Sequence, residues 1–78
     1  MTKAATRDRQ LMLFADIVET SSTASAYLRL VGESGALKDR AGMRYHMRCA
    51  IACVKSAVRS IKDLEELGAV ATESEADE

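Results

Sequence analysis

The 78-residue chain contains no proline and no tryptophan, and only 4% of its residues are aromatic. Without proline the chain lacks the residue that most strongly breaks helices. Its β-branched residues do not gather into the alternating runs typical of strands. No apolar run approaches the roughly 18 residues that cross a bilayer. The composition therefore predicts an all-α protein that is not inserted in a membrane.

Cysteine is also scarce, and the two cysteines present, Cys49 and Cys53, are four positions apart. On a helix their Cβ vectors point the same way, so a disulfide between them would strain the helix. Free thiols are typical of a reducing compartment. The first residues are polar and contain no apolar signal segment. We therefore expect a cytoplasmic protein with two reduced cysteines.

The strongest pattern that is present lies between Asp39 and Leu67. Apolar residues recur there three or four positions apart: Met43, Met47, Ala50, Ile51, Val54, Ala57, Val58, Ile61 and Leu64. Basic residues keep the same period on the opposite side, and we call them the basic stripe: Arg44, Arg48, Lys55, Arg59 and Lys62. This pattern predicts one long amphipathic helix.

A first helical segment is predicted from Thr6, a possible N-cap. One face carries Leu11, Phe14, Ile17, Val18, Ser21, Ala24, Leu28 and Val31. Five hydroxyl side chains between Thr20 and Ser25 compete for backbone hydrogen bonds, so the helix either continues with a weak centre or restarts at Ser21 or Ser22. The apolar period keeps its phase across this run, which favours a continuous helix.

Glycines and an aspartate divide the rest of the chain. Gly32 fits the position just beyond a helix end, Asp39 is the expected N-cap of the long helix, and Gly68 is expected to end it. These signals predict a frayed segment at 1–6, a helical hairpin at 7–68 and a disordered acidic tail at 69–78.

The apolar arc of the long helix is too wide for one antiparallel neighbour to cover. A chain of this length also buries little surface alone. We therefore predict that two antiparallel hairpins pair into a dimeric four-helix bundle; the alternative is a monomer in which the N-terminal segment covers the apolar arc. Small residues would let two long helices approach closely: Ala50, Cys53, Ala57 and Ser60. The expected dimer and core residues are Met47, Ile51, Val54, Val58, Ile61, Phe14 and Leu28.

Charge is divided along the chain. Up to Leu64 there are eleven basic and six acidic residues, a balance of +5, whereas six acids and no base follow. The basic stripe is either a solvated helix face or a surface for an anionic partner. Tyr27 and Tyr45 fall beside the main apolar stripes and either contact that partner or cover the edge of the core. The predicted partner-binding residues are thus the basic stripe together with Tyr27 and Tyr45.

Little in the sequence indicates chemistry. His46, Cys49 and Cys53 share one helix edge, but a structural zinc site needs four ligands, usually from two elements. The segment from Gly32 to Gly35 lacks the lysine of a phosphate-binding loop. A single histidine completes no recognisable nucleophile and base arrangement. We therefore expect no enzyme, no metal and no cofactor.

These features favour a small non-enzymatic protein that binds another protein and modulates or inhibits it as a homodimer. The alternative is a nucleic-acid-binding hairpin that uses the basic stripe. In outline the chain resembles Rop-type RNA-binding hairpins, which are short, antiparallel, dimeric and acidic-tailed; the resemblance covers architecture and includes no shared motif. The isoelectric point near 5.8 weighs against nucleic acid, because dedicated nucleic-acid domains are usually strongly basic.

Overall fold

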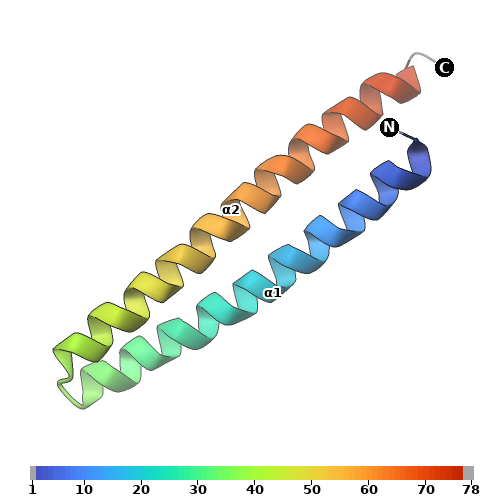
Figure 1. Cartoon of the computed structure of the whole chain (residues 1–78). Helices are drawn as coiled ribbons and strands as arrows, with labels where there is room; N and C mark the ends of the chain where they lie inside the picture. The colour runs from blue at the N-terminus through green and yellow to red at the C-terminus, as the bar shows by residue number, and fades with distance from the viewer. Residues whose placement is uncertain (1, 77–78) are drawn as a thin grey trace.

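A computed structural model of the chain describes the backbone of residues 2–76 and the side chains of residues 2–68. Two helices, α1 (Lys3–Ala36) and α2 (Arg40–Ala76), account for nearly all of it, and no strand occurs within this range. The helices lie antiparallel and side by side, with the start of α1 and the end of α2 at the same end of the hairpin (Figure 1). The predicted all-α antiparallel hairpin is confirmed.

Helix α1 is continuous through its hydroxyl-rich centre. The Thr20 hydroxyl donates to the Asp16 carbonyl at 2.7 Å, and the Thr23 hydroxyl donates to the Glu19 carbonyl at 2.9 Å. These bonds reach back one turn within the helix, so the hydroxyls are satisfied without breaking the backbone ladder. The favoured alternative of one uninterrupted helix is confirmed.

The start of α1 lies earlier than predicted. Thr2 is the N-cap, and its hydroxyl accepts a hydrogen bond from the Ala5 amide at 3.1 Å. Thr6 lies inside the first turn instead, where its hydroxyl donates to the Thr2 carbonyl. Both threonines are suitable caps by residue type, but capping at Thr2 adds a further turn of helix.

The turn between the helices also differs from the expectation at Gly32. Gly32 lies within α1, which ends at Ala36, and Lys38 adopts the left-handed conformation with φ 58°. The Lys38 amide donates to the Gly35 carbonyl at 3.0 Å, and the Asp39 amide donates to the Ser34 carbonyl at 2.8 Å. These bonds satisfy the last carbonyls of α1 and offset the strain of a lysine in this conformation.

Asp39 caps α2 as predicted. Its carboxylate accepts the Gly42 amide at 2.9 Å, and its carbonyl accepts the Met43 amide at 3.0 Å. The predicted end at Gly68 is wrong, because α2 continues to Ala76. One helical glycine costs only about 1 kcal/mol relative to alanine, which a long helix tolerates. The predicted division into domains stays a prediction, and the last two residues of the expected tail, 77 and 78, lie outside the described residues.

The helices meet along a line of mostly small or polar side chains, which we call the hairpin seam. Its buried and half-buried members in α1 are Thr6, Gln10, Leu13, Ile17, Thr20, Ala24, Tyr27, Val31 and Ser34. Its members in α2 are Gly42, His46, Cys49, Ala50, Cys53, Ala57, Ser60, Leu64 and Leu67. The α1 positions alternate steps of four and three, the repeat of two helices that pack along their length.

The hairpin seam contains the small residues expected between two long helices. Ala50 and Ala57 are buried against α1, and Cys53 and Ser60 are half-buried there. In this chain they therefore bring α2 close to α1, and not to a second α2. Small side chains permit close approach wherever they lie, so their presence alone did not identify the neighbour.

Two glycine substitutions test this geometry. A Cβ added at Gly42 would meet the Asp39 carboxylate and would lie 2.9 Å from the Ser34 hydroxyl. Gly42→Ala should therefore disturb the cap of α2 and lower the free energy of unfolding by about 1 kcal/mol. Gly32 is helical with nothing within 4 Å of an added Cβ, so Gly32→Ala should raise that free energy by roughly 0.5–1 kcal/mol. Urea unfolding followed by circular dichroism at one protein concentration measures both; equal shifts would contradict the described cap.

Candidate functional site

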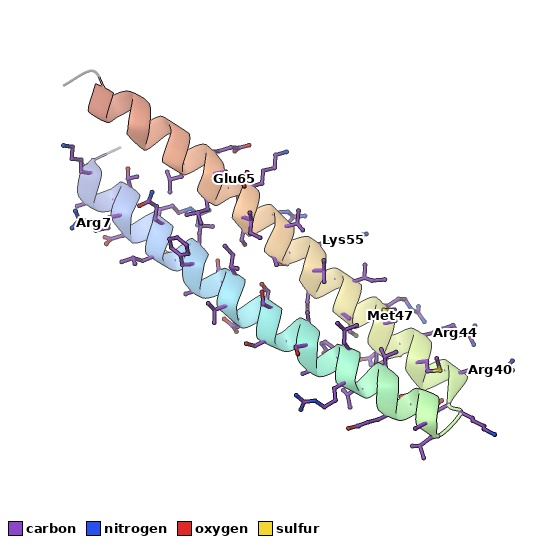
Figure 2. The ribbon with its side chains drawn as sticks, turned by 180° about the vertical axis from the view of Figure 1, so that it is seen from behind. Arg7, Arg40, Arg44, Met47, Lys55 and Glu65 are labelled. Carbon is purple, nitrogen blue, oxygen red and sulfur yellow. The ribbon has the colours of Figure 1, made fainter. Side chains whose placement is uncertain are left out.

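The basic stripe lies on the exposed side of α2. All five of its side chains are exposed. Figure 2 shows Arg44 and Lys55, together with Arg40, projecting from the side of α2 that faces away from α1. None of the side-chain hydrogen bonds found among the described residues involves any of the five. The stripe therefore presents five cationic groups to solvent or to a partner.

Counting from the hairpin seam divides the basic stripe in two. Arg44, Lys55 and Lys62 are two positions from seam residues, which places them on the edge opposite α1. Arg48 is seven positions from Lys55 and lies close to the same edge, whereas Tyr45 and Arg59 each directly precede a seam residue. Because each residue turns the helix by about 100°, Tyr45 and Arg59 share one broad face of the hairpin, and Arg48 lies between that face and the outer edge.

The opposite broad face is apolar. Residues that directly follow seam positions include Leu11, Phe14, Val18 and Leu28 of α1 and Met43, Met47, Ile51, Val54, Val58 and Ile61 of α2. All ten are large and exposed. The residue that follows a seam position points about 100° away from the seam residue. In two antiparallel right-handed helices, this rotation brings the side chains of both helices to the same broad side of the pair. These ten residues thus form one continuous surface, which we call the apolar face.

The seven predicted dimer and core residues all belong to the apolar face. Their exposed fractions range from 39% at Met47 to 59% at Val58. They therefore do not form the core of the hairpin, which consists of the seam. Whether they form a dimer core stays a prediction, and their exposure in a single chain is the reason to pursue it.

The two predicted tyrosines lie in different environments. Tyr45 is 58% exposed beside the basic stripe, whereas Tyr27 is half-buried in the hairpin seam. The Tyr27 and His46 rings stack with centroids 6.4 Å apart, and the Tyr45 ring meets His46 edge-on at 5.4 Å. His46 thus connects the tyrosines across the helices. The sequence pattern grouped His46 with Cys49 and Cys53 on one helix edge and did not connect it with Tyr27, although the three-and-four spacing of Thr20, Ala24, Tyr27 and Val31 marks the seam.

Ser34 completes this aromatic cluster. The Ser34 Oγ and the His46 Nδ1 are 3.3 Å apart, and which of them donates depends on the histidine tautomer. Ser34 is buried. A catalytic serine must reach a substrate and lie beside donors for the oxyanion. A buried serine in a helix-helix seam instead satisfies a polar neighbour and fixes the alignment of the helices near the turn.

Both cysteines are unbridged and half-buried in the seam. The pKa of Tyr27 is raised above the ordinary 10.0, first by the negative charge of the Cys49 thiolate and next by that of Tyr45. Partial burial and a hydrogen bond with Cys49 add to the rise, and Cys53 contributes last. In the described part of the chain, no three His, Cys, Asp or Glu side chains are grouped to hold a metal ion.

Two further findings bear on function. Within the described residues, neither helix is both long and apolar enough to cross a membrane. Comparisons of the chain with protein-family models, with curated proteins and with solved structures found no match. The surfaces of this hairpin are therefore the features that indicate a function.

The Tyr27 environment can be measured by titration. In a Tyr45→Phe variant, Tyr27 is the only tyrosine, and its phenolate should form at a pH above the ordinary midpoint, as read by ultraviolet absorbance. Adding Cys49→Ala should lower that midpoint, because the largest cause of the raised pKa is then removed. Cys53→Ala is the matched control and should lower it less.

The same pKa sets a direction for stability. The unfolded chain releases the tyrosine proton first as pH rises, so the stability linked to Tyr27 is present below the ordinary pKa and is lost above it. An unchanged Tyr27 midpoint in the Cys49→Ala variant would contradict the described contact.

Proposed function

We propose that this chain is a small non-enzymatic interaction protein that forms a homodimer and binds another protein, whose activity it modulates or inhibits. The observation that carries this proposal is the apolar face, on which ten large side chains are exposed along both helices. Single exposed apolar residues are ordinary, but a continuous apolar surface of this size marks an interaction site.

A second copy of the chain would explain why the seam buries small residues while the large apolar residues of the apolar face are exposed. The buried apolar residues of the described hairpin are Leu13, Ala24, Ala50 and Ala57, three of which are alanine. A core of this kind removes little apolar area from water, and short chains commonly gain the missing area by association. Face-to-face pairing of two hairpins gives the four helices around one core that the sequence predicts.

The partner protein would dock on the basic stripe and Tyr45. Exposed arginines beside an exposed tyrosine are typical of binding hot spots, and the unpaired cations favour an acidic surface on the partner. Two unbridged thiols support the cytoplasm as the proposed compartment.

Nucleic acid is the second candidate partner. Five exposed cations spaced along one helix could neutralise successive phosphates, and such binding would weaken steeply as salt rises. The isoelectric point near 5.8 favours the protein partner, because acidic groups elsewhere in the chain repel a polyanion.

Two neighbouring substitutions test the homodimer. Ile51 lies on the apolar face and Ala52 on the opposite face, and both are exposed in the single hairpin. Ile51→Asp should weaken self-association by about 100-fold or more, because the dimer would bury an unpaired charge. Ala52→Asp should sediment as the wild type does, at twice the 8.5 kDa chain mass. A wild-type chain that remains monomeric at high concentration would contradict the homodimer.

Charge reversal tests partner binding. The wild-type chain, used as bait in nuclease-treated extract of its host, should retain one protein in a fixed ratio. Arg48→Glu with Arg59→Glu should lose that protein while circular dichroism stays unchanged, because both side chains are exposed. Arg29→Glu reverses an exposed charge on the edge of α1 that faces away from α2, two positions from both Tyr27 and Val31, and should retain it. Capture that disappears with nuclease would instead support the nucleic-acid alternative.

A further inference from the structure

The acidic side chains of α1 lie away from the apolar face. Asp16, Glu19 and Glu33 each directly precede a seam residue, so they lie on the broad face opposite the apolar face. Asp8 is two positions from the seam residues on either side of it, which places it on the outer edge of α1. Because none of these acids directly follows a seam residue, α1 contributes no carboxylate to the apolar face.

The same separation holds along α2. No acid occurs from Arg40 to Lys62, the part of α2 that carries all of its apolar-face residues. Of the acids that follow among the described side chains, Asp63 and Glu66 directly precede seam residues and lie on the opposite broad face. Glu65 directly follows a seam residue, but it lies beyond Ile61, the last large residue of the apolar face. The apolar face is therefore free of carboxylates over its length.

Cations border the apolar face on both long sides. The outer edge of α2 carries Arg44, Lys55 and Lys62, and Figure 2 shows Arg44 and Lys55 projecting away from α1. The outer edge of α1 carries Arg29, and Arg7 directly follows a seam residue at the end of the face away from the turn. Long basic side chains in such places can extend along apolar surface while their charges stay in water.

This combination fits the surface of an anionic bilayer. Helices with exposed apolar residues on one side and cations beside them lie in the plane of the interface, with the apolar side buried about 5–10 Å deep. The two helices lie side by side as one layer, so their apolar sides can enter the same interface together (Figure 1). An anionic bilayer is charged over its whole surface, so it meets the cations on both sides of the face without a matched pattern of acids.

Distance limits the repulsion from the acids. The carboxylates on the opposite broad face are about one helix diameter, roughly 10 Å, further from the bilayer than the apolar face. This distance is close to the Debye length at physiological salt, so their repulsion is largely screened. The bordering cations stay near the headgroups, where each of them strengthens binding by about fivefold.

We infer that the apolar face of a single hairpin binds the interface of a bilayer that contains anionic lipid, with the cations at its borders among the headgroups. Lipid binding goes beyond the proposed homodimer, because the bilayer and the second copy would cover the same side chains and a lipid-bound hairpin would be a monomer. The broad face with Tyr45 points away from the bilayer and stays open to a partner protein.

Co-sedimentation with vesicles tests the lipid. The wild-type chain should bind vesicles of phosphatidylserine and phosphatidylcholine in equal parts at least about tenfold more tightly than vesicles of phosphatidylcholine alone, since several cations approach the surface. Raising the salt concentration should weaken this binding. Absence of binding to the anionic vesicles at low salt would overturn the inference, and equal binding to both kinds of vesicle would overturn the role of charge.

Two tryptophan reporters test which face meets the lipid. The chain has no tryptophan, and Phe14 on the apolar face and Met12 on the opposite broad face are 55% and 58% exposed. Vesicles whose acyl chains carry bromine should quench the fluorescence of Phe14→Trp, because its ring enters the acyl boundary. They should leave the fluorescence of Met12→Trp unchanged. Equal quenching of both reporters, or none in Phe14→Trp, would overturn the assigned face.

Charge reversal tests the border of the face. Arg44→Glu and Arg9→Glu make the same change of charge at exposed positions, but Arg9 directly precedes a seam residue and lies on the opposite broad face. Arg44→Glu should weaken binding to the anionic vesicles by about tenfold, whereas Arg9→Glu should weaken it little. Equal losses in the two variants would mean that only net charge matters and would overturn the assigned border.

Sedimentation without lipid separates lipid binding from the homodimer. A chain that sediments as a dimer and does not bind the anionic vesicles would overturn lipid binding and leave the homodimer intact. A monomer that binds these vesicles would support lipid binding and overturn the homodimer. A monomer that binds neither its own copy nor the vesicles would overturn both, and another protein would then cover the apolar face.

Discussion

The small size of the side chains in the hairpin seam is the constraint on which the rest of this structure depends. Ala24, Ala50 and Ala57 allow the two helices to lie close together over their length, but they bury little apolar area. The larger residues, such as Phe14 and Ile51, stand one position further round each helix and remain exposed. The small residues of the hairpin seam thus account both for the close packing of the two helices and for the exposed apolar face beside the seam.

The polar members of the seam align the helices where its apolar members cannot. Alanine contacts alone permit one helix to slide along the other, because neighbouring turns offer similar surfaces. Ser34 and His46 meet at one level, Tyr27 stacks on His46, and Asp39 caps α2 at the adjoining turn. A shift by one turn would separate Ser34 and Tyr27 from His46 and leave the buried Ser34 hydroxyl without its partner. Register is therefore set near the turn and carried along the rigid helices.

The fold could be predicted from local signals, whereas the division into seam and apolar face could not. Helical periodicity, the absence of proline and the cap at Asp39 each act within a few residues, and all were interpreted correctly. Gly32 and Gly68 were misread because a helical glycine costs little when both flanks favour helix. The apolar arc of α2 was recognised, but which edge of it faces α1 depends on the partner helix. Ala50 and Ile51 are both apolar and differ chiefly in the size of their side chains. Only the packing of α2 against α1 showed which of the two is buried.

Neighbouring residues of α2 lie on three different surfaces of the hairpin. The seam residue Cys53 faces α1, Val54 belongs to the apolar face, and Lys55 lies on the edge away from α1. Because each residue turns the helix by about 100°, three consecutive side chains point in three different directions. Self-association through the apolar face would leave Tyr45, Arg48 and Arg59 uncovered, so dimerisation and partner binding would not compete for the same side chains. A dimer would also present two copies of these side chains, and a partner able to reach both would gain affinity from the second contact without any new residue.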